Sequence, residues 1–146
     1  MSARFYEQDV SARLQQRRAL SAFLDALVKA RQPQLRKVQL RYIFCSDTEL
    51  HKINLQFLQH DDFTDIITFD LRERPDDLIG EIYISVDRVA ENAQTFKTSY
   101  DHELHRVIFH GALHLCGLGD KSPAEQKAMR AAENVALDAW FAEQQS

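Results

Sequence analysis

The sequence predicts an α+β fold, with a small mixed β-sheet of three or four strands covered by helices. Two observations support this prediction. Segments with apolar residues at helical spacing and short β-branched segments of period two follow one another in the order α-β-α-β-β-α-α-α. No internal repeat, low-complexity tract or Pro/Gly/Ser-rich linker interrupts the 146 residues, so we expect a single domain over residues 1–146.

Three elements are predicted in the first half of the chain. The segment from Ser11 to Arg31 has apolar residues at helical spacing, and Pro33 ends this helix. Apolar and polar residues then alternate over residues 38–44, which is typical of a strand. Ser46 followed three residues later by Glu49 forms a capping-box pattern, which predicts the start of a short helix.

Five elements are predicted in the second half. The β-branched residues 64–70 and 81–85 indicate two strands separated by a polar loop. Two helices are expected over residues 87–96 and 100–116. The sequence Ser-Pro-Ala-Glu over residues 122–125 combines an N-cap serine, a proline at the first helical position and a glutamate at the third, so it predicts the start of a last helix.

The composition is that of a soluble globular protein. Hydrophobic residues make up 45% of the chain and charged residues 27%, and no apolar run is long enough to span a membrane. The N-terminal residues lack the apolar core and cleavage pattern of a secretory signal. The two cysteines, Cys45 and Cys116, are too few for a stapled secreted scaffold and are expected to be small buried hydrophobes. We therefore expect a cytoplasmic protein with no membrane partner.

Charge is distributed unevenly along the chain. Residues 1–41 hold nine Lys and Arg against three Asp and Glu, whereas the remaining residues hold nine against nineteen. A basic N-terminal third suits contact with a polyanion, and the acidic remainder argues against a protein that wraps nucleic acid on all sides. Basic solvent faces on one helix and one strand would explain the same asymmetry, and charge alone favours that interpretation.

The candidate chemistry lies in the segment His110-Gly-Ala-Leu-His114-Leu-Cys-Gly117-Leu-Gly119-Asp120. Two histidines four residues apart on a helix project from one face, about 40° apart around the axis, as two ligands of one metal require. Gly117 stands where the helix should end and suits the left-handed conformation that ends it. Gly119 adds a second flexible point, so Asp120 can turn back as a third ligand. Three protein ligands with an open fourth position describe a catalytic zinc site with one Zn²⁺ per chain, although nickel or iron would also suit these donors.

A histidine pair at this spacing is weak evidence when it stands alone. The alternative is a pair of hydrogen-bonded structural histidines on an ordinary helix; the glycines and the carboxylate favour metal binding. Zinc peptidases place a glutamate directly after the first histidine as general base, and Gly111 occupies that position here. A peptidase is therefore the weakest hypothesis, kept for the helix geometry alone.

Two other polar residues lie on the same predicted helix. Glu103 shares the face of His110 but lies two turns away, roughly 10 Å along the axis, and we expect it to be solvated on the surface. His105 points more than about 90° away from the ligand face and is expected to be structural or exposed.

The segment HGALHLCGLGDK resembles the signature of the YbeY family of bacterial ribosomal-RNA maturation factors and metal-dependent endoribonucleases. Further matches are Asn54 to Phe57, Asp61, TDIITF over residues 64–69, GEIYIS over 80–85 and ELHRV over 103–107. The resemblance implies an α+β fold with a zincin-like metal-binding helix, a bound zinc and a cytoplasmic location. It also implies a role in processing ribosomal RNA ends and in ribosome quality control, with ribosomal RNA, the ribosome and ribosomal proteins as partners.

The sequence departs from the family pattern at two positions. The family usually has a histidine as the third ligand where Asp120 stands, so the ligand set here becomes two histidines and one aspartate. The added negative charge should make the ion acidify its bound water less. An arginine implicated in RNA cleavage usually follows the aromatic residue matching Phe57, and Leu58 stands there instead.

These residues define the expected site. His110, His114 and Asp120 are the candidate metal ligands, and we take His114 as the catalytic residue. Gly117 supports the site through the turn that it allows. The resemblance places Thr64 and Asp65 beside the site as supporting residues. A polar turn at the start of a strand would explain these two residues equally well.

Two functions from different classes follow. The first is a single-strand-specific metallo-endoribonuclease that acts in ribosomal RNA 3′-end maturation and ribosome quality control. The alternative is a zinc-stabilised ribosome-biogenesis factor that binds RNA or protein partners without cleavage, and Leu58 favours this alternative. The sequence singles out no residue for RNA binding and predicts no oligomeric state.

Overall fold

The computed structural model describes residues 1–144 and consists of a four-stranded mixed sheet and five helices, so the predicted small mixed sheet covered by helices is confirmed. Strand β2 is parallel to β1 and β4, β3 is antiparallel to β4, and the order across the sheet is β1-β2-β4-β3. Within residues 1–144, no helix combines the length and apolar character needed to cross a membrane. The elements are β1 (Ala3–Glu7), α1 (Arg17–Arg31), β2 (Lys37–Cys45), α2 (Asp47–Leu58), β3 (Ile66–Asp70), β4 (Asp77–Ser85), α3 (Val86–Thr95), α4 (Tyr100–Leu115) and α5 (Pro123–Gln144).

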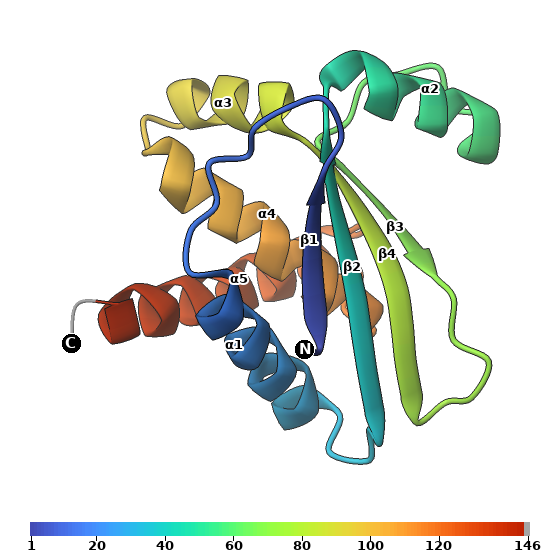
Figure 1. The fold of residues 1–146 in the computed structure, drawn as a ribbon, viewed down its shortest axis with the longest axis vertical. Coiled ribbons are helices and arrows are strands. Elements are labelled where there is room, and N and C mark those ends of the chain that lie inside the picture. The colour runs from blue at the N-terminus through green and yellow to red at the C-terminus, as the bar shows by residue number, and fades with distance from the viewer. Residues whose placement is uncertain (145–146) are drawn as a thin grey trace.

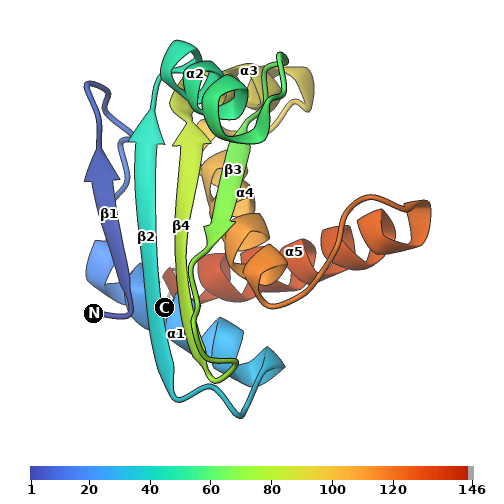
Figure 2. The ribbon, with the colours of Figure 1, turned by 90° about the vertical axis from the view of Figure 1, so that its right-hand side faces the viewer.

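One face of the sheet carries the main core. Alternate residues of the two central strands, Tyr42 and Phe44 on β2 and Ile82 and Ile84 on β4, are fully buried there. Figures 1 and 2 show α1, α4 and α5 gathered on this side, with α2 at the end of the sheet where β2 ends. The Tyr42 hydroxyl donates a 2.8 Å hydrogen bond to the carbonyl of Ile108, which ties β2 to the middle of α4.

Helix α4 approaches the sheet most closely at Gly111. A Cβ atom at this position would lie 2.9 Å from Cγ2 of Ile82 and 3.1 Å from Cδ1 of Ile66. Both distances are shorter than ordinary carbon–carbon contacts, and Cγ2 is a branch that cannot swing away without moving the side chain. Close packing of helix on sheet therefore explains a glycine where zinc peptidases carry their glutamate.

Gly111→Ala should destabilise the protein although alanine is the better helix former. The gain in helix propensity is about 1 kcal/mol, and overpacking a tight contact costs about 1–3 kcal/mol. We expect a net loss of about 1 kcal/mol in the free energy of unfolding, measured by urea denaturation. Gly117→Ala cannot serve as the control, because the backbone conformation of Gly117 would strain an alanine. Ala131→Gly on the exposed side of α5 instead measures the effect of helix propensity alone. A Gly111→Ala protein more stable than the natural one would contradict the close approach.

The N-terminal region differs from the sequence prediction. Strand β1 was not predicted, and α1 begins at Arg17 rather than Ser11. The residues between these elements include three with left-handed backbone, Asp9 (φ 57°), Arg13 (φ 53°) and Gln16 (φ 57°), and these conformations interrupt any helix there. Strand β1 is a short edge strand that depends on its pairing with β2 more than on its own pattern.

His105 is buried at the opposite end of α4 from the histidine motif, as the structural alternative predicted. Its ring stacks on Trp140, with ring centroids 5.4 Å apart, and its Nδ1–H donates to the carbonyl of Asp101 at 2.8 Å. Within residues 1–144, Nε2 of His105 has no hydrogen-bond partner. Burial lowers the pKa of His105, and the contacts with Asp101 only partly oppose this effect.

Acid should destabilise the fold through His105. Because the folded-state pKa lies below the ordinary value, the native state binds fewer protons than the unfolded chain near pH 6. The stability from the neutral ring is fully present above the unfolded pKa of about 6.5 and is lost as pH falls through the lower folded-state pKa. His105→Phe should therefore flatten the fall in unfolding free energy between pH 7 and pH 5. An unchanged slope in urea titrations of the two proteins would contradict this assignment.

Candidate metal centre

The C-terminal end of α4 forms a turn that brings Asp120 back beside the helix. Gly117 has φ +102°, as predicted, and its N–H donates to the carbonyl of His114 at 3.0 Å. The N–H of Leu118 reaches back to the carbonyl of Leu113 at 3.2 Å. These two bonds form a Schellman motif, for which a left-handed residue is required at the position of Gly117. The turn thereby reverses the chain within a few residues.

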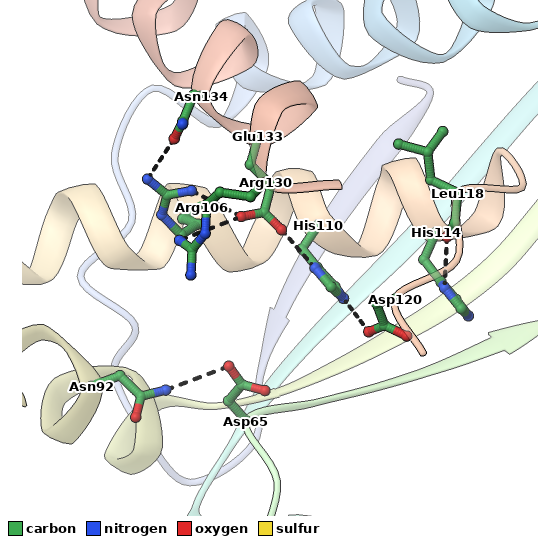
Figure 3. A network of polar contacts seen from close by, with 10 residues as sticks. All are labelled: Asp65, Asn92, Arg106, His110, His114, Leu118, Asp120, Arg130, Glu133 and Asn134. Carbon is green, nitrogen blue, oxygen red and sulfur yellow. Dashed lines mark hydrogen bonds and ion pairs between the residues drawn. The ribbon is translucent and has the colours of Figure 1, made fainter. Parts of the chain in front are cut away.

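The two histidines present parallel rings on one side of α4. The ring centroids of His110 and His114 lie 6.4 Å apart, with 3° between the ring planes. Nδ1–H of His114 donates to the carbonyl of Leu118 at 3.2 Å, which leaves Nε2 with its lone pair. Oδ2 of Asp120 lies 3.3 Å from Nε2 of His110 (Figure 3). The structure therefore brings together all three predicted ligand residues.

Glu133 on α5 holds His110 from the other side. Oε2 of Glu133 accepts a 2.7 Å hydrogen bond from Nδ1–H of His110, and Oε1 accepts a 2.9 Å bond from Arg106. Arg106 also donates to Oδ1 of Asn134 at 2.8 Å, and Arg130 lies 3.8 Å from Glu133 (Figure 3). Glu133 is only 5% exposed. A carboxylate on Nδ1 fixes the tautomer of a histidine so that Nε2 can act as a ligand.

The polar network shifts the pKa values of its members in opposite directions. Burial alone would lower the pKa of His110, but the hydrogen bond to Glu133 and the carboxylates of Glu133, Asp120 and Asp65 raise it above the ordinary value. Burial alone would raise the pKa of Glu133, but its bonds from His110 and Arg106 bring it below the ordinary value. The carboxylates around His110 therefore favour a positive charge at its ring.

The donor chemistry of this cluster fits a zinc-type ion. Each imidazole uses Nδ1 for an oxygen acceptor and keeps Nε2 for a ligand, which is the arrangement of metal-bound histidines, and Asp120 adds an oxygen donor. Within residues 1–144, however, no three His, Cys, Asp or Glu side chains form a group ready to hold an ion. The rings are parallel rather than convergent, so ion binding would require them to turn toward each other. The ligand roles remain predictions.

The two supporting residues lie at the start of β3, facing the same region. The Thr64 hydroxyl donates to the carbonyl of Ile66 at 3.3 Å, and the Asp65 carboxylate accepts a 3.5 Å bond from Asn92. Burial raises the pKa of Asp65, and the nearby charge of His110 partly opposes this rise. Both residues line the cleft beside His110. Their supporting role remains a prediction.

A cleft of about 460 Å³ opens over the two rings. Leu58, His60 and Lys121 line it together with the three candidate ligands. Leu58 therefore lies at the site, where it supplies an apolar wall and no charge. Lys121 is the candidate cation in this cleft.

Sequence reasoning missed two residues of this region. Glu133 lies 23 positions from His110 in sequence, and its position on α5 gave no local pattern that could connect it with the motif. Glu103 was expected to be solvated, and that expectation is wrong, since it is only 4% exposed. Packing of α5 and α3 against α4 buries the face of α4 that carries Glu103. The helical wheel of α4 alone cannot predict this long-range packing.

The site can be compared with known proteins. Residues 4–140 match the sequence model of a family described as endoribonuclease YbeY. The chain belongs to this family. An endoribonuclease YbeY from Parabacteroides distasonis is 42% identical over 137 residues, which cover 94% of each chain. An endoribonuclease YbeY from Phocaeicola vulgatus is 56% identical over 99 residues, covering 68% of this chain and 71% of that one.

A solved structure supports the YbeY fold assignment. The solution structure of TM1509 from Thermotoga maritima superposes with a TM-score of 0.61 at 26% sequence identity. The match covers 97% of this chain and 93% of that chain, so the two chains share the overall fold. Against the YbeY pattern, this chain carries Asp120 and Leu58 at two positions of the same cleft.

Proposed function

We propose that this chain is a metal-dependent, single-strand-specific endoribonuclease that acts in ribosomal RNA 3′-end maturation and ribosome quality control in the cytoplasm. Membership of the endoribonuclease YbeY family supports this activity. The observation that carries the proposal is the pair of imidazoles whose Nδ1 atoms are occupied, together with Asp120, which lies beside Nε2 of His110. Ribosomal RNA, the ribosome and ribosomal proteins are the proposed partners, and residues 1–146 are proposed as one domain.

We propose His110, His114 and Asp120 as ligands of one Zn²⁺ per chain, with His114 as the catalytic residue. A bound zinc would supply positive charge to phosphoryl oxygens and a more acidic water for attack on phosphorus. Glu133 orients His110, and Leu118 orients His114 through its carbonyl. Lys121 at the edge of the cleft is placed to attract the RNA backbone, a role that Leu58 cannot fill.

Cleavage of a labelled single-stranded RNA by the purified full chain tests this proposal. We expect cleavage that stops in EDTA, returns on addition of Zn²⁺ and spares the same sequence in a duplex. Cleavage that continues unchanged in EDTA would overturn the metal mechanism. Failure to cleave with any divalent metal, together with retained RNA binding, would favour the alternative factor that binds without cutting.

A further inference from the structure

A second and larger cleft of about 760 Å³ continues from the metal centre between α3, α4 and α5. Its volume lies in the range of sites that hold small organic ligands. Glu103 and His110 lie seven residues apart on the same face of α4, so the cleft runs about 10 Å along this helix. Its lining includes His110 and Asp120 at the metal centre and Phe96, Glu103, Lys127 and Arg130 farther along.

Glu103 is a largely buried residue whose side chain lines the cleft. The residue is 4% exposed, and across residues 1–144 no hydrogen bond or ion pair reaches its side chain. Burial raises its pKa; the charge of Arg106 opposes this rise and that of Asp65 adds to it. Because Glu103 lines the cleft, a hydrogen-bond donor that enters the cleft can reach its carboxyl group.

Phe96 lies in the same cleft with its ring in solvent. It follows the last residue of α3, lines the cleft and is 59% exposed. Exposed aromatic rings in polar clefts are the surfaces on which proteins stack the bases of single-stranded RNA. Phe96 therefore favours a flat ligand.

The charges of the cleft divide between its floor and its rim. Glu103 and Asp65 lie at the floor, where they would repel a phosphate, and the charge of the partly buried Arg106 is balanced there by Glu133. Two exposed cations on α5, Lys127 and Arg130, lie at the rim, where they suit a phosphate. A ligand that is flat, rich in donors and flanked by negative charge fits this arrangement.

We propose that this cleft binds one unpaired nucleobase of the RNA substrate, with its amino-bearing edge against Glu103 and its face against Phe96. The inference rests on the proposed endoribonuclease function and assigns a base preference to the same site. Guanine fits best, because its ring N–H and amino group are adjacent donors that match the two oxygens of a carboxylate. Uracil presents a single ring N–H between two carbonyl oxygens, and the carboxylate repels those oxygens.

Binding of two labelled hexanucleotides to the full chain in EDTA tests the base preference without cleavage. One is oligo-U, and the other carries a single guanine in place of a central uracil. We expect the guanine-containing oligomer to bind about tenfold more tightly, and Glu103→Gln to reduce this ratio to within about twofold. Glu91→Gln, an exposed glutamate on α3 outside the cleft, is the matched control and should keep the full ratio.

Phe96→Ala gives a second test that does not depend on a buried position. Because stacking tolerates any base, it should weaken both oligomers about tenfold and leave their ratio unchanged. Equal binding of both oligomers by the natural chain would overturn the proposal, as would a Glu103→Gln protein that keeps the preference. If Glu103→Gln does not fold, unchanged affinities in Phe96→Ala would overturn it. If the chain cleaves RNA but shows no base preference, only this inference is overturned. If the chain neither cleaves nor binds RNA, the proposed function is overturned as well.

Discussion

Replacing His114 by alanine should abolish RNA cleavage while leaving the fold intact. The substitution removes the Nε2 lone pair that we assign to the metal, and with it several kcal/mol of charge stabilisation, so we expect a loss of at least about 10³-fold in single-turnover rate. His114 is exposed, and its ring makes one hydrogen bond, to the Leu118 carbonyl. The free energy of unfolding should therefore change by less than about 1 kcal/mol.

A matched control lies on the same helix. His102 stands near the start of α4, where its ring stacks on Phe141 and lines neither cleft of the site. His102→Ala should cleave RNA at the natural rate. If His114→Ala retained cleavage within a few-fold of the natural chain, His114 would be neither ligand nor catalytic residue.

Glu133→Gln should impair both metal binding and stability. Loss of a carboxylate that orients a ligating histidine typically reduces metal affinity 10- to 100-fold. The substitution also leaves Arg106, whose side chain is 15% exposed, without its charged partner. Removing one partner of a buried ion pair costs about 3–5 kcal/mol. We expect the free energy of unfolding to fall by an amount near the lower end of that range.

The control for Glu133→Gln removes only an exposed hydrogen bond of the same network. Asn134→Ala takes away the second hydrogen bond of Arg106 and leaves Glu133 on His110. This variant should keep its metal affinity and lose less than about 1 kcal/mol of stability. A Glu133→Gln protein with natural metal affinity in competitive chelator titrations would show that His110 needs no orienting carboxylate.

Local sequence rules predicted those parts of the fold that local interactions determine. Both predicted N-caps are formed, since Ser46 Oγ accepts from the N–H of Glu49 and Ser122 Oγ accepts from the N–H of Glu125, each at 3.1 Å. The reciprocal bond of a capping box is present at Ser122, whose N–H donates to Oε1 of Glu125 at 3.0 Å, whereas the Glu49 carboxylate accepts from Lys52 at 3.3 Å. The left-handed turn at Gly117 depends on the lack of a side chain and was predicted for that reason. Cys45 and Cys116 are buried, as expected.

Features that depend on packing between distant segments could not be predicted in this way. Strand β1 has only five residues and forms because β2 offers it an edge. Glu133 joins the site only when α5 crosses α4, and Glu103 is buried by the same packing and by α3. The histidine motif was visible because both rings lie one turn apart on one helix, whereas the carboxylate that orients His110 comes from α5.

Metal analysis of the full chain, purified without a histidine tag, tests the central claim most directly. If the two imidazoles and the aspartate share one ion, plasma mass spectrometry should find about one zinc per chain. The same measurement on a folded His110→Ala protein should find close to none. A natural chain without bound transition metal, or a His110→Ala protein that keeps the full stoichiometry, would contradict the account.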